Sequence, residues 1–134
     1  MNISFTDKTD NITVEALESL FASVKWKSAK YSDQLLQAIN GSHSVVTAWD
    51  GEKLVGLINA LSDGALTAYF HYMLIDPNYQ DLGIGKKLID IMLDRYKDYP
   101  AKVLIAYPEV TEFYKKCGFQ QEEGMVPLYI SELI

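Results

Sequence analysis

The sequence predicts an α+β protein in which two helices precede an antiparallel meander and a strand–loop–helix–strand unit. Three observations carry this prediction. Apolar residues recur at helical spacing over 14–24 and 35–39. Two β-rich runs flank the pair Asp50-Gly51, which is a strong hairpin signal. A tight loop at 80–86 then follows a β-branched and aromatic run and opens a long helical stretch.

The size and charge of the chain limit the classes of function that it can have. The 134 residues contain no stretch that resembles a linker, so a single domain over 1–134 is expected. The net charge of -6 argues against broad electrostatic binding to nucleic acid or to an anionic membrane. A phosphate site stays open, because backbone N–H groups bind phosphate without basic side chains.

Cys117 is the only cysteine, so no intrachain disulfide can form and a reducing compartment is expected. No long apolar segment marks a signal peptide or a membrane span, which favours a cytoplasmic location. No His lies close to Cys117 in the sequence, so the thiol is interpreted as core filler, with a nucleophilic role as the weaker alternative.

The first half of the chain contains the two helices and the meander. A short strand is expected at 2–6, and Thr13 is a good N-cap for the first helix. Ser32 is the candidate cap of the second helix, which closes at Gly41. Three strands joined by two Asp-Gly turns follow. The third, 67–75, ends because Pro77 cannot donate to a sheet ladder.

The second half alternates helix and strand. A helix is expected from Ile84 to Tyr96, followed by a nearly all-apolar run at 102–106 that suits a buried strand. Pro108 begins a last helix that Gly118 ends. The run Val126 to Ile130, together with Phe119, supplies material for a closing strand.

The loop before the central helix is the most informative segment. Gly83 and Gly85 allow the backbone to turn sharply and approach a ligand closely. The free N–H groups and the dipole of the helix start suit a pyrophosphate. A nucleotide-hydrolase P-loop is excluded because Lys87 replaces its hydroxyl residue, and the dinucleotide fingerprint fails because Leu88 replaces its third glycine. A purely structural turn remains the alternative.

Three segments together resemble the GNAT N-acetyltransferases. Residues 75–88 match the family's acetyl-coenzyme A signature, Gln/Arg-x-x-Gly-x-Gly/Ala, at Gln80, Gly83 and Gly85. Residues 112–119 resemble its Phe-Tyr helix ending in Gly-Phe, and 49–56 look like its preceding hairpin. The resemblance implies the acyl-CoA N-acyltransferase fold. That fold is a mixed, mostly antiparallel twisted sheet of about six to seven strands with about four helices, and its fourth and fifth strands splay apart.

In this family the end of the fourth strand holds the pantetheine and the glycine loop holds the pyrophosphate. Tyr107 stands where relatives often have an asparagine that contacts the cofactor, so that contact is less secure. The Asp81 carboxylate would repel phosphates and is expected to point outward. The residues thus implied in binding acetyl-CoA are Met73, Leu74, Ile75, Gln80, Asp81, Leu82, Gly83, Ile84, Gly85, Lys86 and Tyr107.

The resemblance also implies catalytic roles. Tyr114 takes the position of the tyrosine that protonates the leaving thiolate, although helical spacing alone would place it in the core. Many relatives carry an acidic residue near the end of the fourth strand, which is absent here. His71 is of the right chemical type to serve as base, with Tyr72 and a water relay as alternatives. No metal is implied.

The acceptor site is less defined. Trp26, Tyr31, Asp63, Tyr69 and His71 are candidates for its lining, although Asp63 also suits a simple Asp-Gly turn. The resemblance implies transfer of the acetyl group of acetyl-CoA to the primary amine of a small molecule. The alternative is a catalytically silent coenzyme A-binding or regulatory module with the same fold. Self-association as a homodimer through the closing strands is also compatible with the resemblance.

Overall fold

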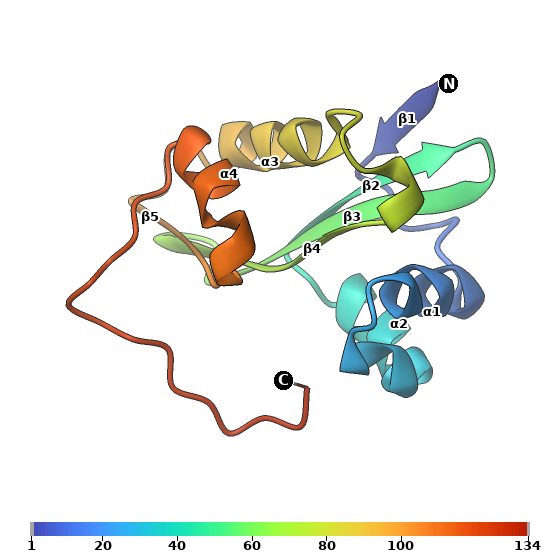
Figure 1. Cartoon of the computed structure of the whole chain (residues 1–134), viewed down its shortest axis with the longest axis horizontal. Coiled ribbons are helices and arrows are strands. Elements are labelled where there is room, and N and C mark those ends of the chain that lie inside the picture. The colour runs from blue at the N-terminus through green and yellow to red at the C-terminus, as the bar shows by residue number, and fades with distance from the viewer. Residues whose placement is uncertain (1, 134) are drawn as a thin grey trace.

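The computed structural model describes residues 2–133 and places a five-stranded sheet between two groups of helices (Figure 1). The expected mixed, mostly antiparallel sheet is confirmed, with five strands in place of six to seven. The strand order is β1-β2-β3-β4-β5, and among the described strands only β4 and β5 pair in parallel. The strands are β1 (Ile3–Thr6), β2 (Ser44–Asp50), β3 (Lys53–Ser62), β4 (Thr67–Ile75) and β5 (Ala101–Leu104).

Within residues 2–133 the chain also forms four α-helices and three short 3₁₀ helices. The α-helices are α1 (Val14–Ser23), α2 (Ser32–Asn40), α3 (Ile84–Arg95) and α4 (Thr111–Lys116). The 3₁₀ helices are η1 (Lys27–Tyr31), η2 (Pro77–Tyr79) and η3 (Pro108–Val110). Over residues 2–133, no helix has both the length and the apolar character needed to cross a membrane.

The two caps predicted near the amino terminus had different outcomes. The Thr13 cap is confirmed, because its Oγ1 accepts a hydrogen bond of 3.1 Å from the Ala16 N–H. The Ser32 cap was wrong: α2 begins at Ser32 itself, and the preceding Tyr31 makes no capping hydrogen bond. The 3₁₀ helix η1 runs directly into α2, so the chain already turns helically before Ser32.

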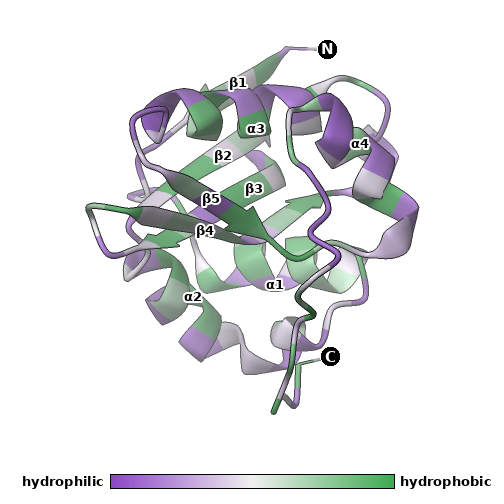
Figure 2. Cartoon of the chain, turned by 90° about the vertical axis from the view of Figure 1, so that its left-hand side faces the viewer, coloured by the Kyte–Doolittle hydropathy of each residue, from purple (hydrophilic) through white to green (hydrophobic). Residues whose placement is uncertain are grey.

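The sheet separates two apolar clusters, one on each face. The first packs α3 against the sheet and includes Val55, Ile58 and Leu88. The second packs α1 and α2 against the other face and includes Leu17 and Leu57. Because both faces are covered, the central strand β3 is buried along most of its length, and Figure 2 shows hydrophobic residues along it.

The expected closing strand was wrong. Among the described residues, those after Phe119 form no strand, and the apolar side chains of Val126, Leu128 and Ile130 are exposed. Pro127 removes a ladder donor from the middle of the segment. The segment leaves α4, loops along the outside of the molecule and ends near α1 and α2 (Figure 1). There Glu132 Oε2 accepts a hydrogen bond of 3.2 Å from the Tyr31 hydroxyl.

Candidate active site

Strands β4 and β5 part after four paired residues. Their pairing runs from Thr67 opposite Ala101 to Phe70 opposite Leu104, where β5 ends. Strand β4 continues for five more residues, to Ile75, with no strand beside it on that side among the described residues. The expected splay of the fourth and fifth strands is therefore confirmed.

A β-bulge sets the direction of the unpaired half of β4. Ile58 lies opposite Met73 and Ala60 opposite Phe70, so two β4 residues face Asn59 alone. Asn59 fills the gap in the ladder, because its Oδ1 accepts a hydrogen bond of 2.7 Å from the Tyr72 N–H. The bulge reverses the alternation of faces: Phe70 packs toward α3, whereas Tyr72 packs toward α1.

The ladder directs two free amides into the splay. The Asp76 N–H donates to the Val55 carbonyl at 2.8 Å, which makes this a hydrogen-bonded pair. Such pairs alternate along an antiparallel ladder, so Leu74 bonds β3 whereas the N–H groups of Met73 and Ile75 point away from it. An extended ligand chain can bond to amides directed in this way, as a peptide does when it adds to a sheet edge.

The loop after η2 leads directly into the start of α3. Gly83 is the N-cap in the left-handed conformation, with φ of 80°, and Asp81 also has a positive φ, 63°. The first intrahelical bond joins the Lys87 N–H to the Gly83 carbonyl at 3.2 Å. The preceding N–H groups, through Lys86, therefore have no partner within the helix and point outward. With the helix dipole, they favour phosphate oxygens.

Glycine is required at the two positions of the loop, Gly83 and Gly85, for different reasons. A Cβ atom on Gly83 would meet no heavy atom within 4 Å, so this position needs glycine for its backbone angle. A Cβ on Gly85 would lie 3.2 Å from Met73 Cε and 3.6 Å from Phe113 Cζ. Gly85 thus allows the start of α3 to sit directly against β4 and α4.

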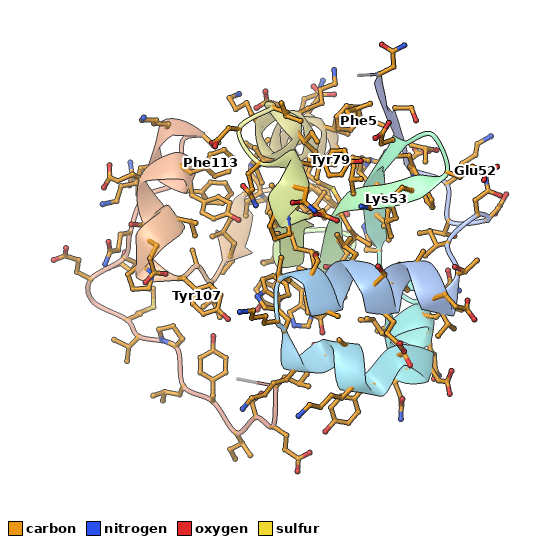
Figure 3. The ribbon with its side chains drawn as sticks, turned by 45° about the vertical axis from the view of Figure 1, so that its right-hand side comes forward. Phe5, Glu52, Lys53, Tyr79, Tyr107 and Phe113 are labelled. Atoms are coloured by element: carbon orange, nitrogen blue, oxygen red, sulfur yellow. The ribbon has the colours of Figure 1, made fainter. Side chains whose placement is uncertain are left out.

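Side chains on the neighbouring turn fix the loop from the sheet side. The Gln80 side-chain amide donates to the Ile75 carbonyl at 3.3 Å. The Tyr79 hydroxyl donates to Asp50 Oδ2 at 2.6 Å, and Lys53 lies 5.2 Å from the centre of the Tyr79 ring (Figure 3). These contacts tie the turn to the β2–β3 hairpin.

Two charged groups belong to the loop itself. Lys86 Nζ donates to Asp90 one turn further along α3, at 2.6 Å to Oδ1. This hydrogen bond raises the pKa of Lys86 and offsets its positive charge locally. The Asp81 side chain is exposed, as is that of Leu82.

A cavity of about 460 Å³ occupies the splay. Met73 belongs both to this cavity and to the surroundings of Gly85, so the cavity and the loop are continuous along β4. The lining residues are Trp26, Ser28, Ile58, Tyr69, Phe70, His71, Tyr72, Met73, Ile89, Leu104, Ile105, Ala106, Tyr107, Pro108, Val110, Tyr114, Tyr129, Ser131 and Leu133.

Tyr114 reaches the cavity from α4. Its ring packs edge-on against Phe113 and Phe119, at centroid distances of 5.1 and 6.0 Å. Burial raises the pKa of Tyr114 to about 12, so its hydroxyl stays protonated at neutral pH. Cys117, one turn further along, packs against the same core, and burial raises its pKa as well. The interpretation of Cys117 as a packing residue is therefore supported.

His71 lies at the bulge, on the cavity wall. Its ring stacks on Tyr72 at 4.1 Å and on Tyr69 at 5.5 Å. The residue as a whole is exposed, but the neighbouring rings partly desolvate the imidazole, which lowers its pKa below the ordinary value. At pH 7 the imidazole is therefore neutral and able to accept a proton.

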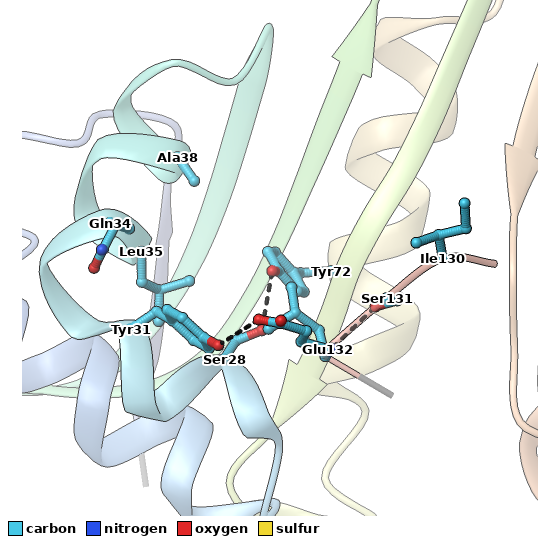
Figure 4. A pocket seen from close by; sticks show the side chains of 10 residues that line it. Ser28, Tyr31, Gln34, Leu35, Ala38, Tyr72, Ile130, Ser131 and Glu132 are labelled. Atoms are coloured by element: carbon cyan, nitrogen blue, oxygen red, sulfur yellow. Dashed lines mark hydrogen bonds between the residues drawn. The ribbon is translucent and has the colours of Figure 1, made fainter.

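The structure brings most of the predicted acceptor residues together. Trp26, Tyr69 and His71 line the cavity, whereas Tyr31 lines a neighbouring cavity of about 410 Å³ (Figure 4). Asp63 lies elsewhere: its Oδ1 accepts three backbone N–H groups of its own turn, which also lowers its pKa. Tyr107 lines the cavity with its side chain largely exposed.

Sequence reasoning missed two contributions to the cavity. Ser28, on η1, is buried and shares a hydrogen bond of 3.1 Å with the Tyr72 hydroxyl. The carboxy-terminal segment supplies Tyr129, Ser131 and Leu133. Neither contribution has a local signal, because both depend on contacts between distant parts of the chain. Within residues 2–133, no group of three His, Cys, Asp or Glu side chains is placed to hold a metal ion.

Comparison with known sequences gives one family. A family model described as an acetyltransferase (GNAT) domain matches residues 9–125. An uncharacterized N-acetyltransferase ycf52 of Pyropia yezoensis is 32% identical over 86% of this chain and 69% of its own length. The histone acetyltransferase TAP1 of Glycine max is 30% identical over 89% of this chain, which spans 57% of that relative.

Solved structures share the fold. A GNAT-family acetyltransferase protein, SP0256, from Streptococcus pneumoniae superposes with a TM-score of 0.82 over 98% of this chain and 99% of its own, at 24% identity. A putative acetyltransferase from Deinococcus radiodurans gives a TM-score of 0.84 over 98% of this chain and 89% of its own, at 22% identity. At these identities the likeness establishes the fold alone.

Proposed function

The chain belongs to the GNAT acetyltransferase family, and from that premise we propose that it transfers the acetyl group of acetyl-CoA to the primary amine of a small molecule. The observation that carries this proposal is the continuity of two sites along β4. The outward N–H groups at the start of α3 suit a pyrophosphate, and the free amides of Met73 and Ile75 continue into the splay. A phosphorylated, extended thioester fits both sites at once.

Residues of this chain would then hold and polarise the thioester that acetyl-CoA supplies. The Met73 or Ile75 N–H is directed toward the splay and would donate a hydrogen bond to the oxyanion that forms when an amine attacks the carbonyl. Tyr114 lies across the same cavity and would donate its proton as the carbon–sulfur bond breaks. Its pKa of about 12 keeps the hydroxyl protonated at neutral pH, so it can donate a hydrogen bond to the departing sulfur as negative charge develops there.

His71 is the proposed base that removes a proton from the incoming ammonium. Because its pKa is lowered, kcat/KM should rise with pH through a value below ~6.5, and the protonated imidazole should be inactive. Replacing His71 with Gln should remove this rise on the acidic side of the pH–rate profile and should lower the pH-independent value of kcat/KM by roughly 10-fold. A pH–rate profile of both proteins checks this expectation. An unchanged rise with pH in His71→Gln would assign proton removal to water or to Tyr72.

The exposed carboxylate of Asp81 should weaken acetyl-CoA binding. Asn keeps the left-handed backbone of this position and removes the charge, so Asp81→Asn should tighten binding by about two- to fivefold at low salt. The gain should fade at high salt, since screening weakens the repulsion. Calorimetry at two ionic strengths measures it. Asp98→Asn, beyond the other end of α3, makes the same charge change and should have no effect.

The central test is binding and turnover in the purified protein. Saturable acetyl-CoA binding by calorimetry, with release of free thiol when amines are added, is the expected result. A protein that does not bind acetyl-CoA would refute the proposal. No Asp or Glu lines the cavity among the described residues, which favours a second candidate: a silent coenzyme A-binding or regulatory module. Tight binding without acetylation of any amine would establish that candidate.

The setting of the reaction follows from composition. A chain whose only cysteine is a packing residue suits a reducing compartment, which we take to be the cytoplasm. Its net charge of -6 would draw amine cations rather than nucleic acid toward the protein.

A further inference from the structure

The cavity in the splay carries no formal charge at neutral pH. No Asp, Glu, Lys or Arg is among the described residues that line it. His71 is neutral there, and the remaining polar groups are hydroxyls such as those of Ser28 and Ser131. An acceptor with several ammonium groups would lose water on entry without meeting a carboxylate, which disfavours its binding.

Aromatic rings form one wall of this cavity as a continuous row. Trp26 lies 6.1 Å from Tyr72, Tyr72 stacks on His71, and His71 stacks on Tyr69. Trp26 comes from the chain just after α1, and the other three rings come from β4. Ring faces bind apolar and aromatic groups and also attract a single ammonium before it is deprotonated.

The carboxy-terminal segment lies along one side of the cavity. Tyr129, Ser131 and Leu133 all line it, and the hydrogen bond between Glu132 and Tyr31 fastens the segment to η1 (Figure 4). A lysine in a folded protein would have to pass this segment together with its own backbone. The position of this segment therefore favours a free small molecule over a protein side chain.

We infer, on the basis of the proposed function, that the acceptor is a primary monoamine carried by an aromatic or branched apolar group. The apolar group lies against the row formed by Trp26, Tyr72, His71 and Tyr69. Tyr129 supplies the facing wall and determines specificity for that group. Polyamines, amino sugars and lysine-containing peptides are poor acceptors.

The test compares four acceptors with the purified 134-residue protein: 2-phenylethylamine, spermidine, glucosamine and a lysine-containing peptide. The kcat/KM for 2-phenylethylamine should exceed each of the others by at least ~10-fold, which is typical of discrimination by an apolar pocket. Replacing Tyr129 with Ala should lower the kcat/KM for 2-phenylethylamine about 10-fold. The kcat/KM for ethylamine, which has no group to contact Tyr129, should stay nearly unchanged. Leu128→Ala is the matched control, since Leu128 is 89% exposed and does not line the cavity.

The outcomes separate this inference from the proposed function. Preference for spermidine, glucosamine or the peptide, or equal losses in Tyr129→Ala and Leu128→Ala, would overturn the inference while leaving acetyl transfer intact. If acetyl-CoA does not bind, the proposed function fails. In that case, binding of 2-phenylethylamine in the absence of acetyl-CoA can still be measured by calorimetry. Binding that is lost in Tyr129→Ala would support the inferred acceptor wall, and absence of binding to the unmodified protein would refute it.

Discussion

Replacing Tyr114 with Phe is expected to lower kcat by about 100-fold and to leave the Kd for acetyl-CoA within about twofold. The substitution removes only the hydroxyl that would protonate the leaving thiolate. The ring contacts with Phe113 and Phe119 remain, so α4 should keep its place. Steady-state kinetics with a good acceptor, beside calorimetry of acetyl-CoA, measures the two quantities separately.

A second tyrosine in the cavity provides the control. Tyr107 also lines it, but from the end of β5 and with 59% of its surface exposed. Tyr107→Phe removes the same atom and should change kcat by less than about threefold, because an exposed hydroxyl is readily replaced by water. Similar losses in both variants would show that neither hydroxyl has a specific role. A normal kcat in Tyr114→Phe would assign Tyr114 to packing alone.

Gly83→Ala is expected to weaken acetyl-CoA binding by at least ~10-fold. A side chain at φ of 80° costs about 1–2 kcal/mol, and the backbone will relax away from the conformation that aims the first N–H groups of α3 outward. When these N–H groups no longer point outward, several hydrogen bonds to phosphate oxygens weaken at once. Calorimetry of acetyl-CoA and thermal unfolding of the variant check both parts of this expectation.

Gly51 provides a matched control for the backbone strain that an alanine introduces at Gly83. It lies in the turn between β2 and β3 with φ of 59°, and a Cβ there would likewise meet nothing within 4 Å. Gly51→Ala should therefore cost a similar free energy of unfolding and leave acetyl-CoA binding unchanged. If both variants bind acetyl-CoA equally well, the loop does not hold the pyrophosphate through its backbone.

The parts of the fold that the sequence predicted depend on local chemistry. The hairpin at Asp50-Gly51, the cap at Thr13 and the helix that starts after Gly83 each follow from a few adjacent residues. The glycine loop was predictable in part for the same reason, since Gly83 is needed for a local backbone angle, whereas Gly85 is needed for packing against the distant Met73 and Phe113. The roles of His71 and Tyr114 came only from family resemblance, and they remain predictions.

The parts that were missed depend on distant contacts. The bulge at His71 and Tyr72 exists because Asn59, on another strand, accepts the unpaired N–H, and nothing within β4 indicates this. The closing strand failed because β-rich composition does not supply a neighbouring strand. The segment that contains Tyr129 lies beside the cavity only after α4 and η1 are in place.

The bulge also bears on how this protein can change over evolutionary time. Loss of one residue at His71 or Tyr72 would restore the strict alternation of β4. Met73 would still lie opposite Ile58 and Ile75 opposite Gly56, so their side chains would keep their face and their amides would keep pointing away from β3. Loss of a residue from the regular part of β4 after Met73 would instead turn every later position over to the other face. Changes in the length of β4 should therefore be tolerated at the bulge and not along the regular part of the binding edge.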